Sequence, residues 1–78
     1  MKIKILGSGC ANCVRLEENT RQAVKELELS AEIEHIYDMT DIILYGVMSL
    51  PSLVVNEKVV LSGKVPSTEE IKIFLNNI

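Results

Sequence analysis

The sequence predicts an α/β fold of order βαβαββα, a four-stranded mixed sheet flanked by three helices. Three observations support it. An alternating polar and apolar pattern at residues 2–6 is followed by a long amphipathic helical pattern at residues 11–28. Two short apolar runs are joined by residues 56–57, which is typical of a β-hairpin. A capping-box sequence at residues 67–70 then opens a closing helix.

The first half of the chain contains a strand, a long helix and a second strand. Alternation at residues 2–6 places Ile3 and Ile5 on one face of a strand. From residue 11 to 28, apolar residues recur at helical spacing and charged residues occupy the opposite face. Residues 31–37 are rich in β-branched and aromatic side chains, which favours a second strand. We expect this βαβ unit to be parallel and right-handed.

A short helix and a loop follow the second strand. Asp38 or Thr40 can cap a helix that runs to Leu44 or Tyr45, and Gly46 would end it. This arrangement leaves residues 49–51 in a loop.

The last part of the chain contains the hairpin and the closing helix. Residues 53–55 and 58–61 are the two apolar runs, and we expect them to pair as antiparallel strands. The closing helix has an apolar stripe with i, i+3, i+4, i+7 spacing. Its members are Ile71, Phe74, Leu75 and Ile78.

Composition indicates one folded domain over residues 1–78, near the lower size limit for a self-supporting core. The net charge is -3 and Lys and Arg are scattered, so no basic stripe is present and nucleic acid is not expected as a partner. No apolar run approaches membrane-spanning length, and the first residues are too short and charged for a signal peptide. We therefore expect no membrane partner and a cytoplasmic location.

The two cysteines, Cys10 and Cys13, lie where the first strand gives way to the first helix. A thiol in the first turn of a helix faces unpaired backbone N–H groups and the positive end of the helix dipole, which favour the reactive thiolate. The second thiol lies one turn further on, so the pair can close and reopen a small disulfide ring. In a reducing compartment such a pair is more often catalytic or metal-binding than a permanent bridge.

The Cys10-Ala11-Asn12-Cys13 motif after the first strand, with Pro51 before the third, resembles the thioredoxin fold in its minimal, glutaredoxin-sized form. The glycine-rich start of the motif, the turn at residues 45–47 and the loop at residues 62–67 look like the small redox-active disulfide proteins of archaea and bacteria. The resemblance implies a thiol–disulfide oxidoreductase that acts on protein or small-molecule disulfides and is recycled by a reductase. We expect no cofactor.

The resemblance also implies roles for five residues. Cys10 would be the exposed nucleophile, and Cys13 the shielded thiol that resolves the mixed disulfide. Pro51 would be the family's cis-proline beside the cysteine pair, which leaves the backbone of Leu50 free to pair with an extended substrate chain. Gly63 would line the same surface and let a substrate backbone come close. No metal ligand is expected.

Two departures from the larger thioredoxins concern the site. Gly9 stands where those proteins carry a tryptophan, so their flat aromatic surface is missing. Lys4 stands six residues before Cys10, where they carry a buried carboxylate that assists deprotonation of the second cysteine. A base must come from elsewhere or be water. His35 is assigned no role, because a single mid-strand histidine is more often a packed or half-exposed residue.

Two other functions remain open. Copper-chaperone domains of similar length also carry two cysteines after their first strand, where thiolates suit a soft monovalent metal. Those domains follow the order βαββαβ, and they usually carry a methionine where this chain has Ser8. Within this metal-binding alternative, a structural zinc site is weaker than a copper site, because zinc would need a second pair of ligands. The other function is a non-catalytic thioredoxin-like adaptor with vestigial cysteines, which the intact spacing disfavours.

Overall fold

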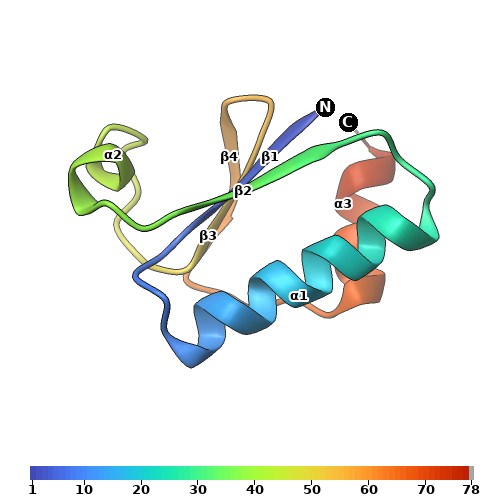
Figure 1. The fold of residues 1–78 in the computed structure, drawn as a ribbon, viewed down its shortest axis with the longest axis horizontal. Coiled ribbons are helices and arrows are strands. Elements are labelled where there is room, and N and C mark those ends of the chain that lie inside the picture. The colour runs from blue at the N-terminus through green and yellow to red at the C-terminus, as the bar shows by residue number, and fades with distance from the viewer. Residues whose placement is uncertain (78) are drawn as a thin grey trace.

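The computed structural model describes residues 1–77 and has the predicted order βαβαββα (Figure 1). Helices lie on both faces of a four-stranded mixed sheet, as the sequence predicts. The elements in chain order are β1 (Lys2–Leu6), α1 (Ala11–Glu26), β2 (Glu32–Ile36), α2 (Met39–Ile43), β3 (Ser52–Val55), β4 (Lys58–Ser62) and α3 (Thr68–Asn76).

The strands lie in the order β2-β1-β3-β4, with β1 and β2 parallel and the other two pairs antiparallel. Leu6 pairs with Ile36 on one side and with Ser52 on the other, and Ser52 pairs with Ser62. The last residues of β1, β2 and β4 therefore meet the first residue of β3. We call this the site end of the sheet, defined by Leu6, Ile36, Ser52 and Ser62.

One face of the sheet is covered by α1 and α3, which run beneath it in Figure 1. Ile3 and Ile5 point to this face and are fully buried against α1. On α3, Ile71 and Leu75 of the predicted stripe are buried, whereas Phe74 is 39% exposed. Ile78 lies outside the described residues. More buried residues gather on this face than on the other, so it carries most of the core. Burial of one such aliphatic side chain contributes roughly 1.5–3 kcal/mol.

The opposite face carries a smaller apolar cluster under α2. Leu6 and Val54 are buried there together with Ile42 of α2. These two strand residues alternate with neighbours that face α1, as the two-residue period of a strand requires. The short α2 begins at its predicted cap, where the Asp38 side chain accepts a hydrogen bond from the Thr40 N–H at 2.8 Å.

The long helix α1 ends at Glu26, two residues before the predicted end. Glu28 adopts a left-handed backbone conformation with φ of 54°. Its N–H donates to the Lys25 carbonyl at 3.2 Å, and the Leu29 N–H donates to the Val24 carbonyl at 3.1 Å. This pair of bonds is the Schellman arrangement, which usually has glycine at the left-handed position. Because glutamate and not glycine occupies that position, the sequence does not indicate where the helix ends.

The hairpin between β3 and β4 turns at Asn56 and Glu57, which both have positive φ, 50° and 68°. A side-chain oxygen of Asn56 accepts a hydrogen bond from the Lys2 N–H at 3.0 Å, and Glu57 pairs with Lys4 at 2.8 Å. These contacts tie the turn to β1.

No helix within residues 1–77 is long and apolar enough to cross a membrane.

Candidate functional site

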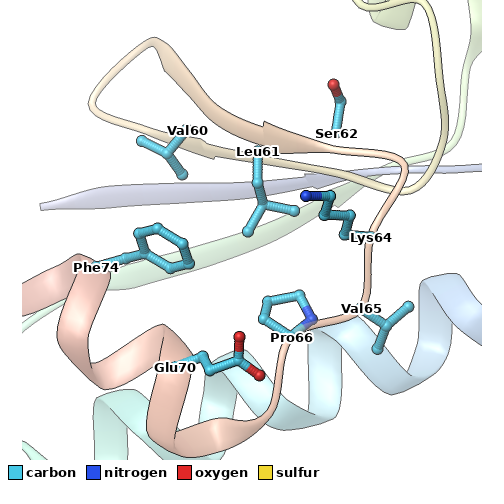
Figure 2. A pocket seen from close by; sticks show the side chains of 8 residues that line it. All are labelled: Val60, Leu61, Ser62, Lys64, Val65, Pro66, Glu70 and Phe74. Atoms are coloured by element: carbon cyan, nitrogen blue, oxygen red, sulfur yellow. The ribbon is translucent and has the colours of Figure 1, made fainter.

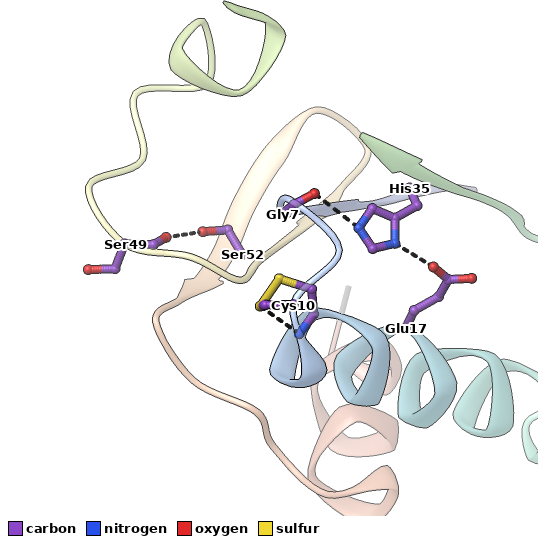
Figure 3. The surroundings of a disulfide bond; sticks show 7 residues. Gly7, Cys10, Glu17, His35, Ser49 and Ser52 are labelled. Carbon is purple, nitrogen blue, oxygen red and sulfur yellow. Dashed lines mark hydrogen bonds and ion pairs between the residues drawn. A yellow bond between two sulfur atoms is a disulfide. The ribbon is translucent and has the colours of Figure 1, made fainter. Parts of the chain in front are cut away.

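Cys10 and Cys13 form a disulfide at the start of α1, with their Cα atoms 5.0 Å apart (Figure 3). Cys10 is the N-cap residue, and its sulfur accepts a hydrogen bond from the Cys13 N–H at 3.2 Å. Cys10 is exposed, whereas Cys13 is fully buried one turn inside the helix. An incoming disulfide can therefore approach Cys10 and not Cys13.

The position of Cys10 also favours its charged form after reduction. The helix N-terminus brings the Cys13 N–H, which has no partner within the helix, and the positive end of the helix dipole to the Cys10 sulfur. Hydrogen bonding and positive potential both stabilise a thiolate relative to a thiol. The accessible sulfur is thus also the one that lies at the helix N-terminus.

Gly7 packs directly against the buried cysteine. A Cβ atom at Gly7 would overlap Cys13 Sγ and lie 3.0 Å from Cys13 Cβ. The Gly7 N–H donates to the Ile36 carbonyl at 3.0 Å, which fixes the chain at the site end of the sheet. The sequence pattern indicates only that residues 7–9 end the first strand, so it missed this contact.

The structure brings Pro51 and Gly63 together at the site end of the sheet. The Gly63 N–H donates to the Pro51 carbonyl at 2.8 Å. Gly63 has φ of 73°, and a Cβ on it would lie 2.9 Å from the Cβ of Ser49. The Leu50–Pro51 peptide bond is cis, which is the isomer that the resemblance implies. Pro51 is buried, and direct contact between Pro51 and the cysteines stays a prediction.

The side chain of Leu50 is half-buried and packs against the cluster under α2. Nearby, the Ser52 hydroxyl donates to the Ser49 carbonyl at 2.7 Å and holds the loop before β3 in a tight turn (Figure 3). The loop is therefore anchored on both sides of the Leu50–Pro51 bond.

His35 lies on the α1 face of the sheet, because it pairs in register with Ile5. Its Nδ1 atom contacts the Glu17 carboxylate, and its Nε2 atom lies 3.2 Å from the Gly7 carbonyl oxygen (Figure 3). The hydrogen bond to His35 is the main reason why the pKa of Glu17 lies below its ordinary value, and Arg21 acts in the same direction. The side chain is packed, as the sequence predicts, between Glu17 and Gly7.

An aromatic ring lies beside the cysteine loop even though no tryptophan precedes Cys10. The ring of Tyr37 stacks on His35 with centroids 4.0 Å apart. A Cβ on Gly9 would lie 3.4 Å from its Cε1 atom, and Tyr37 is 58% exposed. Sequence reasoning considered only the residue before Cys10, so it missed this ring from the end of β2.

Lys4 points to the opposite face from His35 and takes no part in the cysteine environment. Its ammonium group donates to a carboxylate oxygen of Glu57 at 2.8 Å and to the Tyr45 hydroxyl at 2.6 Å. These hydrogen bonds, that to Glu57 first, raise the pKa of Lys4 above its ordinary value. Lys4 therefore stays protonated near neutral pH and cannot serve as the missing base.

A groove between β4 and α3 reaches Ser62 of the site end (Figure 2). Val60, Leu61 and Phe74 form its apolar part, and Lys64 and Glu70 add charged groups. None of the predicted site residues lines it. Across residues 1–77, no three side chains of His, Cys, Asp or Glu gather in a way that could hold a metal ion.

The chain matches the family model described as a thioredoxin domain over residues 1–76. It is 50% identical, over 76 residues, to a thioredoxin of Methanothermobacter thermautotrophicus; the match covers 97% of this chain and 99% of that protein. It is 40% identical, over 70 residues, to a thioredoxin of Methanocaldococcus jannaschii, with 90% of this chain and 80% of that protein covered.

Proposed function

This chain belongs to the thioredoxin family, and we propose that Cys10 attacks the substrate disulfide while Cys13 resolves the mixed disulfide. The protein is a thiol–disulfide oxidoreductase. One observation supports the division of roles most strongly: Cys10 is exposed and accepts the Cys13 N–H, whereas Cys13 is fully buried. Attack on an external disulfide needs both access and thiolate character, and Cys10 combines them.

The reaction consists of two exchanges. In the first, the Cys10 thiolate forms a bond to one substrate sulfur, the substrate S–S bond breaks, and the other sulfur leaves as a thiolate. In the second, Cys13 loses its proton and attacks Cys10 Sγ, which forms the protein disulfide and releases the second substrate sulfur. Two electrons pass from the dithiol to the substrate. Thioredoxins are recycled by a reductase, which returns two electrons to the disulfide.

We further propose that Leu50, Pro51 and Gly63 form the surface that holds the substrate chain. The hydrogen bond from Gly63 to Pro51 joins the two loops at the site end of the sheet. Because Gly63 has no side chain, its loop packs closely against Ser49 and lies beside the Leu50–Pro51 segment. The substrate is a disulfide-bearing protein or small molecule, and we place the cycle in the cytoplasm, where reducing systems keep exposed dithiols available.

A redox titration tests this function. The protein is equilibrated in dithiothreitol or glutathione buffers of defined potential, alkylated, and weighed by mass spectrometry. We expect one two-electron transition, in which the ratio of disulfide to dithiol changes tenfold for about every 30 mV. The Cys13→Ser variant is the control and should show no intramolecular disulfide at any potential.

Two results would contradict the function. Thiols that stay reduced at every potential and bind copper tightly would indicate a metal carrier. A disulfide that persists in every buffer would indicate a structural bridge. The closing helix α3 stands where the copper-chaperone order has a strand, so the fold gives the carrier no support.

A further inference from the structure

The single histidine of the chain is held in a defined position beside the buried cysteine. Its side chain is only 6% exposed. Glu17 of α1 contacts Nδ1, the Gly7 carbonyl faces Nε2, and the Tyr37 ring covers one face. Holding the imidazole in one orientation costs side-chain entropy, which its contacts in the folded protein must offset.

Cys13 Sγ and His35 Nε2 lie around the same point in space. That point is the place where a Cβ on Gly7 would sit: it would overlap Cys13 Sγ and lie 3.9 Å from His35 Nε2. The imidazole and the sulfur are therefore close neighbours across Gly7, both within 4 Å of that point. Because Gly7 has no side chain, only its backbone lies beside the imidazole and the sulfur, and its carbonyl faces Nε2.

The hydrogen-bond partners of His35 can satisfy either the neutral imidazole or the imidazolium, but not equally. Both ring nitrogens face oxygen acceptors, a carboxylate at Nδ1 and a backbone carbonyl at Nε2. A neutral imidazole has one N–H and satisfies only one of them, whereas the imidazolium has two. The disulfide form of the protein thus offers partners for a proton on each nitrogen.

We propose that His35 is the proton acceptor for Cys13 and that Glu17 is the positioning residue that holds its ring. This inference rests on the proposed role of Cys13 as the resolving thiol. It supplies the base that Lys4 cannot provide at the position where larger thioredoxins carry a carboxylate.

With the substrate bound to Cys10, the proton of the Cys13 thiol passes to His35 Nε2. The Cys13 thiolate attacks Cys10 Sγ, the Cys10–Cys13 bond forms, and the bond from Cys10 to the substrate breaks. The electron pair leaves on the substrate sulfur. His35 then carries the proton as an imidazolium between Gly7 and Glu17 until solvent or the product thiolate takes it.

Four other groups around His35 bear on its protonation. On α1 these are Glu17, Arg21 and Cys13, and just after β2 the neighbour is Tyr37. Arg21 binds the Glu17 oxygen that His35 does not use, at 2.9 Å, so the carboxylate is fixed from two sides. The lowered pKa of Glu17 keeps it ionised throughout the neutral range, where it stabilises the positive charge of an imidazolium.

Stopped-flow reaction of the reduced protein with dithiobis(nitrobenzoate) tests the inference. The first exchange releases one nitrothiobenzoate and the second releases another, so absorbance reports both steps in one trace. The leaving thiolate needs no proton, and the second phase therefore reads the attack by Cys13. For His35→Gln at pH 7 we expect a second phase about 100-fold slower, at the lower end of the usual range for loss of a general base. The first phase should stay within about twofold of wild type.

The pH profile separates proton transfer from packing. The second phase should depend less steeply on pH in wild type than in His35→Gln, where only the thiolate that Cys13 forms on its own can react. Glu17→Gln should slow the second phase less than His35→Gln and change the same profile. Glu18→Gln is the matched control, because Glu18 is an exposed neighbour with the same charge.

An unchanged second phase with an unchanged pH profile in His35→Gln would overturn the inference. Equal slowing of both phases would do the same, because it would indicate a general structural effect. If His35→Gln does not fold, the Glu17→Gln profile decides in the same way. Release of only one nitrothiobenzoate by the wild type would instead overturn the roles of Cys10 and Cys13, and this inference with them.

Discussion

Replacing Cys13 by serine should stop the reaction after its first step and leave the substrate joined to Cys10 as a mixed disulfide. Replacing Cys10 by serine should leave no adduct, because Cys13 is fully buried and cannot be reached by an external disulfide. Catalysed disulfide reduction should fall to the rate of uncatalysed exchange in both variants. Intact mass measured under non-reducing conditions, after incubation with a disulfide-bearing peptide, identifies the adduct.

The double variant, with serine at both positions, is the control for adsorbed peptide. Equal adduct formation by Cys10→Ser and Cys13→Ser would contradict the assignment of roles. The trapped complex also tests the substrate surface: amide hydrogen exchange at Leu50 should be slower in the complex than in Cys13→Ser alone. Unchanged exchange at Leu50 would show that the peptide lies elsewhere.

Gly7→Ala should destabilise the oxidised protein by about 1–3 kcal/mol, the usual cost of overpacking a tight interior. The new methyl group would overlap Cys13 Sγ, and the helix start or the end of β1 must move to make room. The loss should be smaller in the reduced protein, because a free Cys13 side chain can rotate away. Urea unfolding of both redox forms measures the difference.

Ser8→Ala is the matched control for Gly7→Ala. Ser8 is exposed in the same loop, and its truncation should change the free energy of unfolding by less than about 0.5 kcal/mol. An oxidised Gly7→Ala protein as stable as wild type would show that the contact between Gly7 and Cys13 is not tight.

Most of the fold could be predicted because local patterns and tertiary structure agree. The capping box at Ser67 and Glu70 forms as expected, and the period-two pattern of β1 places Ile3 and Ile5 in the core. The differences arise where the structure uses a residue against its preference. Glu28 takes a left-handed conformation that usually marks glycine, so the end of α1 could not be placed from the pattern.

The site divides in the same way. Two nearby cysteines at a helix start can be recognised from the sequence alone, because their spacing along the chain lets them form a disulfide. The surroundings of Cys13 cannot, because Gly7, Glu17 and His35 come from three elements and meet only through the parallel pairing of β1 with β2. Strand alternation places His35 on one face of the sheet but does not reveal its partner on α1.

Alkylation of the reduced protein at graded pH tests the central claim, that Cys10 is the exposed thiolate and Cys13 the shielded thiol. Iodoacetamide is added in limiting time courses, and peptide mapping assigns the label to each cysteine. We expect Cys10 to be labelled first, and its labelling to be half-maximal below pH ~8.5, the ordinary value for a free cysteine thiol. Equal labelling of both cysteines, or faster labelling of Cys13, would contradict the assignment.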